Sequence, residues 1–239
     1  MTRSNTDSDT DPEVLYEDNH LIVVNKRASD IVQGDKTGDD PLSETVANYL
    51  ARIHKKPGKA FIGVTHRIDR PVSGVVLFTK TSKALSRMNQ SFRDKKVRKT
   101  YWAVVKNRPE QMEGELRHYL RKNQKQNKSY VVKAGTPDAK EAVTRYRVLG
   151  HSDTYTLLEV EPVTGRHHQI RVQLAHMGCP IKGDLKYGFN RSNNDASIHL
   201  HARTINFEHP VRNEPMTITA PVPAGDPVWS FFESQFTEA

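Results

Sequence analysis

The residues best suited to chemistry gather in one short stretch, Thr65 to Lys80, which reads THRIDRPVSGVVLFTK. Its carboxylate, Asp69, stands between Arg67 and Arg70. Neighbouring cations favour the ionised form of a carboxylate, which suits Asp69 as a nucleophile or an electrostatic anchor and suits it badly as a general acid. The apolar, β-branched run at 75–78 predicts a buried strand, so the polar loop would be held at the mouth of a sheet.

An ordinary surface ion pair explains the same stretch without any chemistry. Most Arg-x-Asp-Arg clusters are exposed pairs that contribute little to stability, and a single short motif has a high false-positive risk. On these residues alone both interpretations stay open.

A second polar cluster runs from Thr164 to Gly188 and reads TGRHHQIRVQLAHMGCPIKGDLKYG. Arg166 and His167 stand where the pattern predicts the start of a helix, and backbone N–H groups at such a start favour anions. On that helix His167 and Arg171 would share a face, which could hold a phosphate or pair with Asp69. A solvated helix face, with Arg171 in a structural ion pair, is the commoner arrangement.

Basic stretches and one tyrosine are the remaining candidates. Tyr101 follows the basic segment 98–100 at the start of an expected strand, where a tyrosine can stack on a nucleic-acid base. An ordinary core aromatic is the commoner case. The basic stretches 93–99 and 117–133 could follow a phosphate backbone, although charged runs are usually just solvated.

Composition narrows the class of function. The chain has 239 residues, with 36 Lys and Arg against 28 Asp and Glu, and its net charge of +8 favours a polyanionic partner such as nucleic acid. A basic protein with no anionic ligand has the same composition. No P-loop, G-x-G-x-x-G or G-x-S-x-G pattern occurs, which disfavours nucleotide-fuelled and serine-hydrolase functions.

The chain contains a single cysteine, Cys179, which excludes an intrachain disulfide and a cysteine-rich zinc site. The candidate metal ligands follow none of the standard zinc spacings, so the sequence predicts no metal site. These candidates are His167, His168, His176 and Cys179.

The domain organisation is expected to be simple. Residues 1–12 predict a disordered N-terminal tail, and residues 13–239 show no boundary sharp enough to divide one catalytic domain. No apolar run approaches the roughly 18 residues of a membrane span, and the N-terminus lacks the apolar core of a signal peptide. We therefore expect a cytoplasmic protein.

Short strands and helices alternate irregularly along the chain. That pattern predicts an α+β fold with a mixed, mainly antiparallel sheet flanked by helices and loops. Residues 114–133 predict either a mobile basic loop or a twisted hairpin. Ser43 is the expected N-cap of the first helix, and Thr81 or Ser82 that of the second. Strands are expected at 14–25 (a hairpin), 100–105, 142–149, 155–161, 198–207 and 216–220, and a C-terminal helix at 228–236.

Together these motifs resemble the RluA-type family of RNA pseudouridine synthases. HRIDRPVSG at 66–74 resembles the family's catalytic H-R-L-D-x-x-T-S-G motif, and the cluster from 164 to 188 resembles its late motif. The segments YED at 16–18, VVNK at 23–26, KTY at 99–101 and the closing motifs between 200 and 221 resemble further parts of the family, in order. Several motifs in order are far more specific than any one of them.

The chain departs from the family pattern at a few positions. Arg27 stands where proline is usual, Ile68 replaces leucine, Val72 replaces threonine, and Gln173 stands where histidine is common. None of these changes removes a charged group from the expected centre. No S4 RNA-binding module precedes residue 14, so the chain resembles the short form of the family.

The resemblance implies a pseudouridine synthase catalytic fold and a role for each catalytic residue. Asp69 would be the nucleophile, attacking either the uracil ring or the ribose C1′. Arg171 would pair with Asp69, and Tyr101 would pack on the base and help to take the C5 proton. Arg67 would fill the gap left by a flipped uridine.

The RNA-binding set that we expect comprises His66, Arg67, Arg70, Lys96, Arg98 and Arg166. The implied reaction, site-specific isomerisation of uridine in structured RNA, needs no metal, nucleotide or redox cofactor. The RNA would be tRNA or large-subunit rRNA, with a slight preference for tRNA by analogy. We expect a monomer with no obligate protein partner.

Two further functions stay open from the sequence. A non-catalytic RNA-binding or folding-helper protein would use the basic stretches and the net charge of +8. A hydrolase using Asp69 with His66 would release free uracil instead of an isomerised nucleoside.

Overall fold

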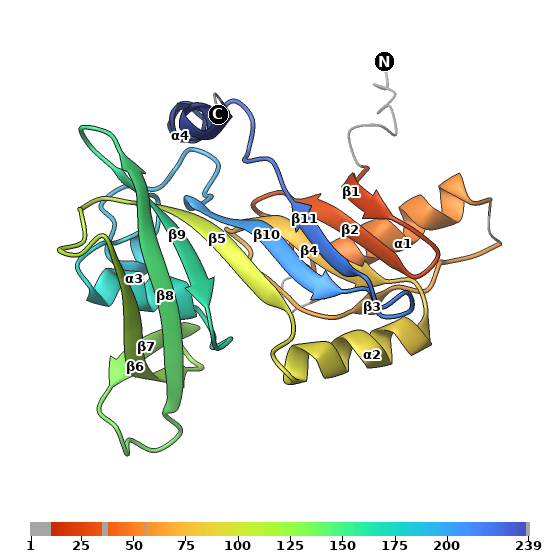
Figure 1. Ribbon diagram of the computed structural model, residues 1–239, viewed down its shortest axis with the longest axis horizontal. Helices are drawn as coiled ribbons and strands as arrows, with labels where there is room; N and C mark the ends of the chain where they lie inside the picture. Colours follow the sequence, from red (N-terminus) through yellow and green to blue (C-terminus); the bar gives the residue numbers. More distant parts are fainter. Residues whose placement is uncertain (1–10, 35–37, 56, 238–239) are drawn as a thin grey trace.

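The computed structural model describes residues 11–34, 38–55 and 57–237. In this part of the chain eleven strands form one sheet, flanked by helices (Figure 1). The strands are β1 (Glu13–Glu17), β2 (Leu21–Lys26), β3 (Gly63–Val64), β4 (Ser73–Thr79), β5 (Arg98–Val105), β6 (Glu113–Asn123), β7 (Lys128–Val132), β8 (Lys140–His151), β9 (Thr156–Pro162), β10 (Leu200–Glu208) and β11 (Pro215–Thr219). The helices are α1 (Leu42–Ile53), α2 (Ser82–Arg93), α3 (Gln169–His176), the 3-10 turn η2 (Leu185–Tyr187) and α4 (Pro227–Thr237).

The order of strands explains how residues from distant parts of the chain meet. It runs β1-β2-β4-β10-β5-β9-β8-β6-β7, with β11 paired to β10 and β3 to β4. Within the described ranges every pairing is antiparallel except that of β10 with β4. The predicted α+β class with a mainly antiparallel sheet is therefore confirmed.

Strand β4 anchors the polar loop that the sequence singles out. All seven of its residues are buried, as the apolar run predicted. It pairs with β10 through Gly74 and Ala202, and Gly74 has a φ of +114°. A Cβ at Gly74 would lie 2.3 Å from the carbonyl oxygen of Ala202, so this close approach of two backbones requires glycine.

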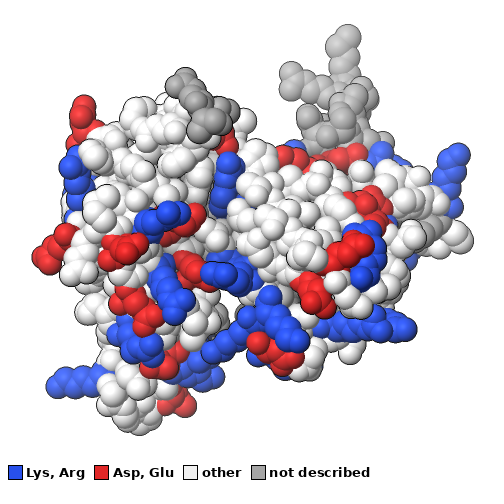
Figure 2. Space-filling model, viewed as in Figure 1, with Lys and Arg blue, Asp and Glu red and all other residues white. Residues whose placement is uncertain are grey.

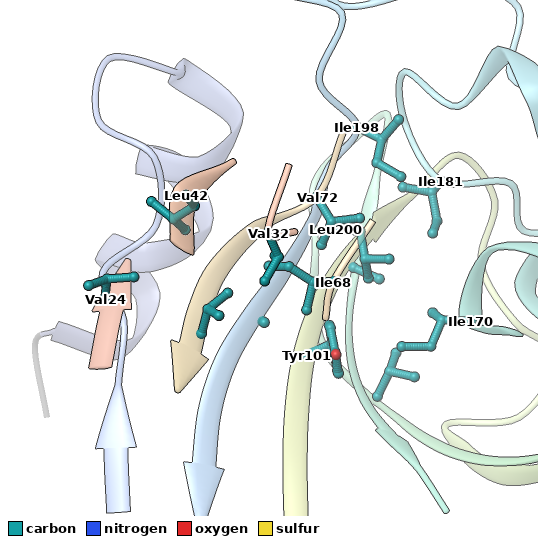
Figure 3. Packing of buried hydrophobic residues seen from close by; sticks show 14 of the residues in the cluster. Val24, Val32, Leu42, Ile68, Val72, Tyr101, Ile170, Ile181, Ile198 and Leu200 are labelled. Carbon is teal, nitrogen blue, oxygen red and sulfur yellow. The ribbon is translucent and has the colours of Figure 1, made fainter. Parts of the chain in front are cut away.

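Apolar side chains anchor the loop that carries Asp69 to the hydrophobic core. Ile68 and Val72, on either side of Asp69, belong to one hydrophobic cluster with Tyr101 of β5 and Leu200 of β10 (Figure 3). Because closely packed side chains resist displacement, the backbone at Asp69 is fixed on both sides.

Several local predictions are confirmed. The hairpin of β1 and β2 and the strands β5, β8, β9, β10 and β11 lie where they were expected, as does α4. The hydroxyl of Thr81 accepts the Ala84 N–H at 3.2 Å and caps α2. Residues 114–133, predicted to be either a mobile basic loop or a twisted hairpin, form the β6–β7 hairpin.

Two helix starts were predicted wrongly. Helix α1 begins at Leu42 after Pro41, so Ser43 is not its N-cap. Helix α3 begins only at Gln169, because His168 takes a left-handed conformation with φ of +55°. His167 is therefore not on the helix and shares no helical face with Arg171.

Residues 1–10 of the expected disordered tail lie outside the described residues. None of the helices in the described ranges is long and apolar enough to cross a membrane.

Candidate active site

The carboxylate of Asp69 is held by an arginine more than 100 positions later in the chain. Arg171 donates from Nη1 to Asp69 Oδ2 at 3.0 Å, and the side chain of Asp69 is 31% exposed. The loop before β4 supplies the aspartate and α3 supplies the arginine. Of the two arrangements that the sequence left open for Arg171, the structure therefore shows the pairing with Asp69. The carboxylate of Asp69 remains partly open to solvent.

Arg171 is itself fixed by a second carboxylate. Its Nε and Nη2 donate to the two oxygens of Asp184, at 2.7 and 2.9 Å, and Asp184 is only 1% exposed. Burial alone would lower the pKa of Arg171, but the hydrogen bonds and charges of Asp184 and Asp69 raise it above its ordinary value. The guanidinium is thus a permanent cation in one orientation.

Tyr101 lines the same cavity as Asp69. The cavity has a volume of about 310 Å³ and is also lined by Arg67, Lys99 and His168. Burial raises the pKa of Tyr101 strongly, and the charge of Asp69 adds to that rise. Its phenol is therefore protonated at neutral pH, and the residue combines an apolar ring with a polar hydroxyl at the cavity wall.

His168 lines the cavity close to Asp69 and was not among the predicted site residues. Its Nε2 lies 3.6 Å from Asp69 Oδ2, and its Nδ1 lies 2.9 Å from the hydroxyl of Tyr187. That hydroxyl also accepts the backbone N–H of Ser129 at 2.9 Å. Burial first, and the charge of Arg171 second, lower the pKa of His168 to about 2.

A buried lysine holds the backbone of the loop that carries Asp69. Lys26 is 1% exposed and donates to the carbonyls of Arg27, Asp30 and Arg70, at 2.8, 2.8 and 3.1 Å. Burial lowers the pKa of Lys26 to about 8. Because Arg70 is next to Asp69, this contact fixes the backbone one residue beyond the carboxylate.

His66, predicted to bind RNA, lies at the base of the cavity wall. Its Nε2 accepts the Leu77 N–H at 3.0 Å, its ring packs on Phe92, and its Nδ1 is buried. Burial lowers the pKa of His66 to about 3, so the ring is neutral. These contacts give His66 a structural role in the loop.

Of the other predicted RNA-binding residues, Arg67 and Arg166 line the cavity, and Lys96 is exposed just beyond α2. Three of the five have protein partners: Arg70 pairs with Asp39, Arg98 pairs with Glu161, and Arg166 donates to the Glu141 carbonyl. Figure 2 shows Lys and Arg gathered in the hollow between the half with β8 and β9 and the half with α2.

Lys99 was missed as a candidate although it lies in a basic stretch. It lines the cavity, and its Nζ lies 5.9 Å from the centre of the Phe92 ring. Burial lowers the pKa of Lys99. In an alternating strand Lys99 and Tyr101 share a face, so the strand period alone could have found it.

The arrangement suits one kind of chemistry. A solvent-accessible carboxylate is held by a buried cation beside a protonated phenol, in a cavity with cationic residues at its rim. No group of three or more His, Cys, Asp or Glu side chains in the described ranges is placed to hold a metal ion. The geometry therefore supports a role for Asp69 as a nucleophile or an electrostatic anchor toward a ligand that carries phosphate groups.

Comparisons with known proteins point to one family. The family model described as RNA pseudouridylate synthase matches residues 20–176. The chain is 34% identical over 227 residues to "Ribosomal large subunit pseudouridine synthase C" of Haemophilus ducreyi, covering 92% of this chain and 69% of that one. It is 33% identical to the protein of the same name from Buchnera aphidicola, covering 87% and 66%. The chain thus spans about two thirds of the length of these relatives.

Solved structures agree on the fold. The structure titled "Human RNA Pseudouridylate Synthase Domain Containing 4" superposes with a TM-score of 0.75 and 24% identity, over 93% of this chain and 92% of that one. "Human RNA Pseudouridylate Synthase Domain Containing 1" superposes with a TM-score of 0.69 and 22% identity, over 92% and 87%. The fold predicted from the motifs is therefore confirmed.

Proposed function

Because the chain belongs to the RNA pseudouridylate synthase family, as its RluA-type motifs predicted, we propose that it isomerises uridine to pseudouridine in RNA. The observation that supports this best is the contact of 3.0 Å between Arg171 and Asp69 at the mouth of a cavity shared with Tyr101. The reaction breaks the bond between N1 of uracil and C1′ of ribose and forms one between C5 and C1′. A proton leaves C5, and N1 gains one.

Asp69 is the nucleophile in this proposal. It attacks either the uracil ring or C1′, and both routes need an ionised carboxylate that is accessible on one side. Arg171 holds that carboxylate without neutralising it by proton transfer, because an arginine stays protonated.

Tyr101 packs on the base and assists removal of the C5 proton. Its pKa is raised partly by the negative charge of Asp69. When Asp69 forms a covalent bond to the substrate, that charge disappears and one of the two causes of the rise is removed. Loss of that charge makes ionisation of the phenol easier, so the phenolate oxygen of Tyr101 is more readily formed, and able to accept a proton, at the stage when the C5 proton must leave.

The substrate in this proposal is a structured ribosomal RNA with a flipped uridine. The relatives' names point to large-subunit rRNA instead of the tRNA that the motif analogy favoured. Arg67 fills the space that the flipped base leaves, and Lys96, Arg70, Arg98 and Arg166 contact neighbouring phosphates. Arg70 and Arg98 would exchange exposed ion pairs of small energy for phosphates.

Tritium release from RNA labelled with [5-³H]uridine tests the reaction, because the C5 hydrogen leaves. The RNA is total RNA from a strain that lacks the gene. Asp69→Asn should abolish release while the dissociation constant for the RNA stays within about twofold, since phosphate contacts dominate affinity. The matched control is Asp153→Asn at an exposed position.

Two results would contradict the proposal. One is full tritium release by Asp69→Asn. The other is free uracil as the product of the unaltered protein, which would indicate a hydrolase. We also propose a cytoplasmic monomer, and sedimentation of the purified chain with and without RNA tests its oligomeric state.

A further inference from the structure

His168 is held in an unusual position at the wall of the catalytic cavity. It is 8% exposed, and its backbone adopts a left-handed conformation with φ of +55°. Its ring stacks on that of His167 at a centroid distance of 3.7 Å and meets the ring of Tyr187 edge-on. Strained conformations of this kind cost free energy and concentrate at functional sites, where the surrounding structure enforces them.

Hydrogen bonding around Tyr187 fixes where the imidazole proton lies. The backbone N–H of Ser129 donates to the Tyr187 hydroxyl, which therefore acts as an acceptor there. Among the described residues, His168 Nδ1 is the only acceptor within hydrogen-bonding distance of that hydroxyl. The phenolic proton therefore points to Nδ1, and burial raises the pKa of Tyr187 to about 12, so the proton stays on the phenol.

With Nδ1 accepting, a neutral imidazole carries its proton on Nε2. The lowered pKa of His168 keeps the ring neutral. Asp69 Oδ2 lies 3.6 Å from Nε2, too far for a hydrogen bond, and Arg171 already donates to that oxygen. His168 lines the cavity of about 310 Å³, so this N–H faces space in which a ligand can bind.

We propose that the Nε2–H of His168 donates a hydrogen bond to a carbonyl oxygen of the flipped uracil. This inference rests on the proposed function. Attack on C1′ pushes the bonding electrons onto the departing uracil, and attack on the ring pushes electrons into it, so both routes place negative charge on the carbonyl oxygens. A preorganised neutral donor stabilises that charge without giving up its proton, which keeps uracil available for reattachment through C5.

The short distance between His168 and Asp69 explains why a neutral imidazole suits this site better than a charged one. A cationic imidazole at this position would form an ion pair with Asp69 and weaken the nucleophile. The neutral tautomer leaves Asp69 paired only with Arg171 while still offering one donor to the base. Ser129 and Tyr187 are positioning residues in this scheme, because they act through His168.

Two substitutions at His168 separate the roles of its nitrogens. Gln places its amide nitrogen near the position of Nε2, whereas Asn places its own near Nδ1. We expect His168→Gln to stay within about fivefold of the wild-type single-turnover rate, and His168→Asn to lose on the order of a hundredfold, as when one donor to a developing oxyanion is removed. Affinity for the RNA should be unchanged in both. The assay is tritium release from [5-³H]uridine-labelled RNA.

A second measurement reads the tautomer of His168 directly, in the wild-type protein and without substrate. In ¹⁵N-histidine-labelled wild-type protein, the two ring nitrogens of His168 should give the signals of a protonated Nε2 and an unprotonated Nδ1. Tyr187→Phe removes the hydroxyl, so it should shift the His168 signals toward a mixture of tautomers and lower the turnover rate without changing RNA affinity.

The possible outcomes are distinct. A proton on Nδ1 in the wild-type spectrum overturns the proposal even if His168→Asn fails to fold. So does a rate for His168→Asn above half that of the wild type, or an equal loss in the Gln and Asn variants. If the wild-type protein releases no tritium from any RNA, the proposed function fails instead.

Discussion

Asp184→Asn is the most informative substitution for the site, because it removes a charge that no substrate should touch. The carboxylate of Asp184 accepts two hydrogen bonds from Arg171, at 2.7 and 2.9 Å. The substitution keeps the size of the side chain but turns one oxygen into an amide donor, which then faces an N–H of the guanidinium. Arg171 is left buried with Asp69 as its remaining carboxylate partner.

The magnitude follows from burial. Arg171 is 5% exposed and Asp184 is 1% exposed, so water cannot replace the lost acceptor. Breaking a buried ion pair by removing one partner costs about 3–5 kcal/mol of the free energy of unfolding. For a domain of this size each kcal/mol corresponds to about 2–4 °C, so the midpoint of thermal unfolding should fall by roughly 6–20 °C.

Thermal and urea unfolding of the purified variant measure this loss. Glu159→Gln is the matched control, because it breaks a pair with Arg147 in which the arginine is 59% exposed, and such a pair is worth less than about 1 kcal/mol. The single-turnover rate of Asp184→Asn should also fall, since Arg171 loses the contacts that orient it. A midpoint within about 2 °C of the wild type would refute the reasoning.

Two further substitutions test the fold and its pH dependence. Gly74→Ala places a methyl group against the Ala202 backbone, so urea unfolding should show a loss of at least about 3 kcal/mol in the free energy of unfolding. In the control Gly165→Ala the new methyl group meets nothing within 4 Å, so the loss should be far smaller. Equal losses in the two variants would contradict the steric argument. The pKa of buried His201 is lowered to about 4, so between pH 6.5 and 4 the unfolded state binds a proton that the folded state does not, and stability falls as the pH drops through that window. In His201→Gln the free energy of unfolding should therefore fall by about 2 kcal/mol less between pH 6.5 and 4.5 than in the wild type. His151→Gln, at an exposed position, should leave the wild-type pH profile unchanged. Parallel pH profiles for His201→Gln and the wild type would count against this account.

The sequence predicted most of the sheet because its strands have strong local signals. The apolar run at 75–78 belongs to a strand that is buried on both faces of the sheet. In β10 the start of the strand is buried on both faces, and exposure alternates only over 204–208. Pairings between distant strands leave no such signal. The parallel contact of β4 with β10, which the site depends on, became visible only in the structure.

The late start of α3 shows why local rules failed at the site. The side chain of Gln169 accepts hydrogen bonds from the Thr164 hydroxyl and the Arg166 N–H, and the His167 ring contacts Ser129, 38 residues earlier. These contacts keep His168 out of the helix. No periodicity within the cluster encodes the contact with Ser129, because Ser129 lies on β7 of another hairpin.

Contacts between distant parts of the chain also explain why the sequence did not predict the roles of some site residues. Asp184 and His168 stand inside the motif from 164 to 188, but their roles depend on where Arg171 and Tyr187 meet them in space. His66 stands in the motif at 66–74 and was predicted to bind RNA. In the structure, the His66 ring turns inward to Leu77 and Phe92.

The place of β10 has a consequence for synthesis on the ribosome. This strand lies between β4 and β5, although about a hundred residues of chain are translated after β5 before β10 is complete. At about 5–20 residues per second, one edge of β5 and the 73–74 end of β4 wait on the order of 5–20 s for their partner. Nascent chains stalled in that interval should aggregate and recruit chaperones, so codon changes that slow translation between 105 and 200 should lower the soluble yield.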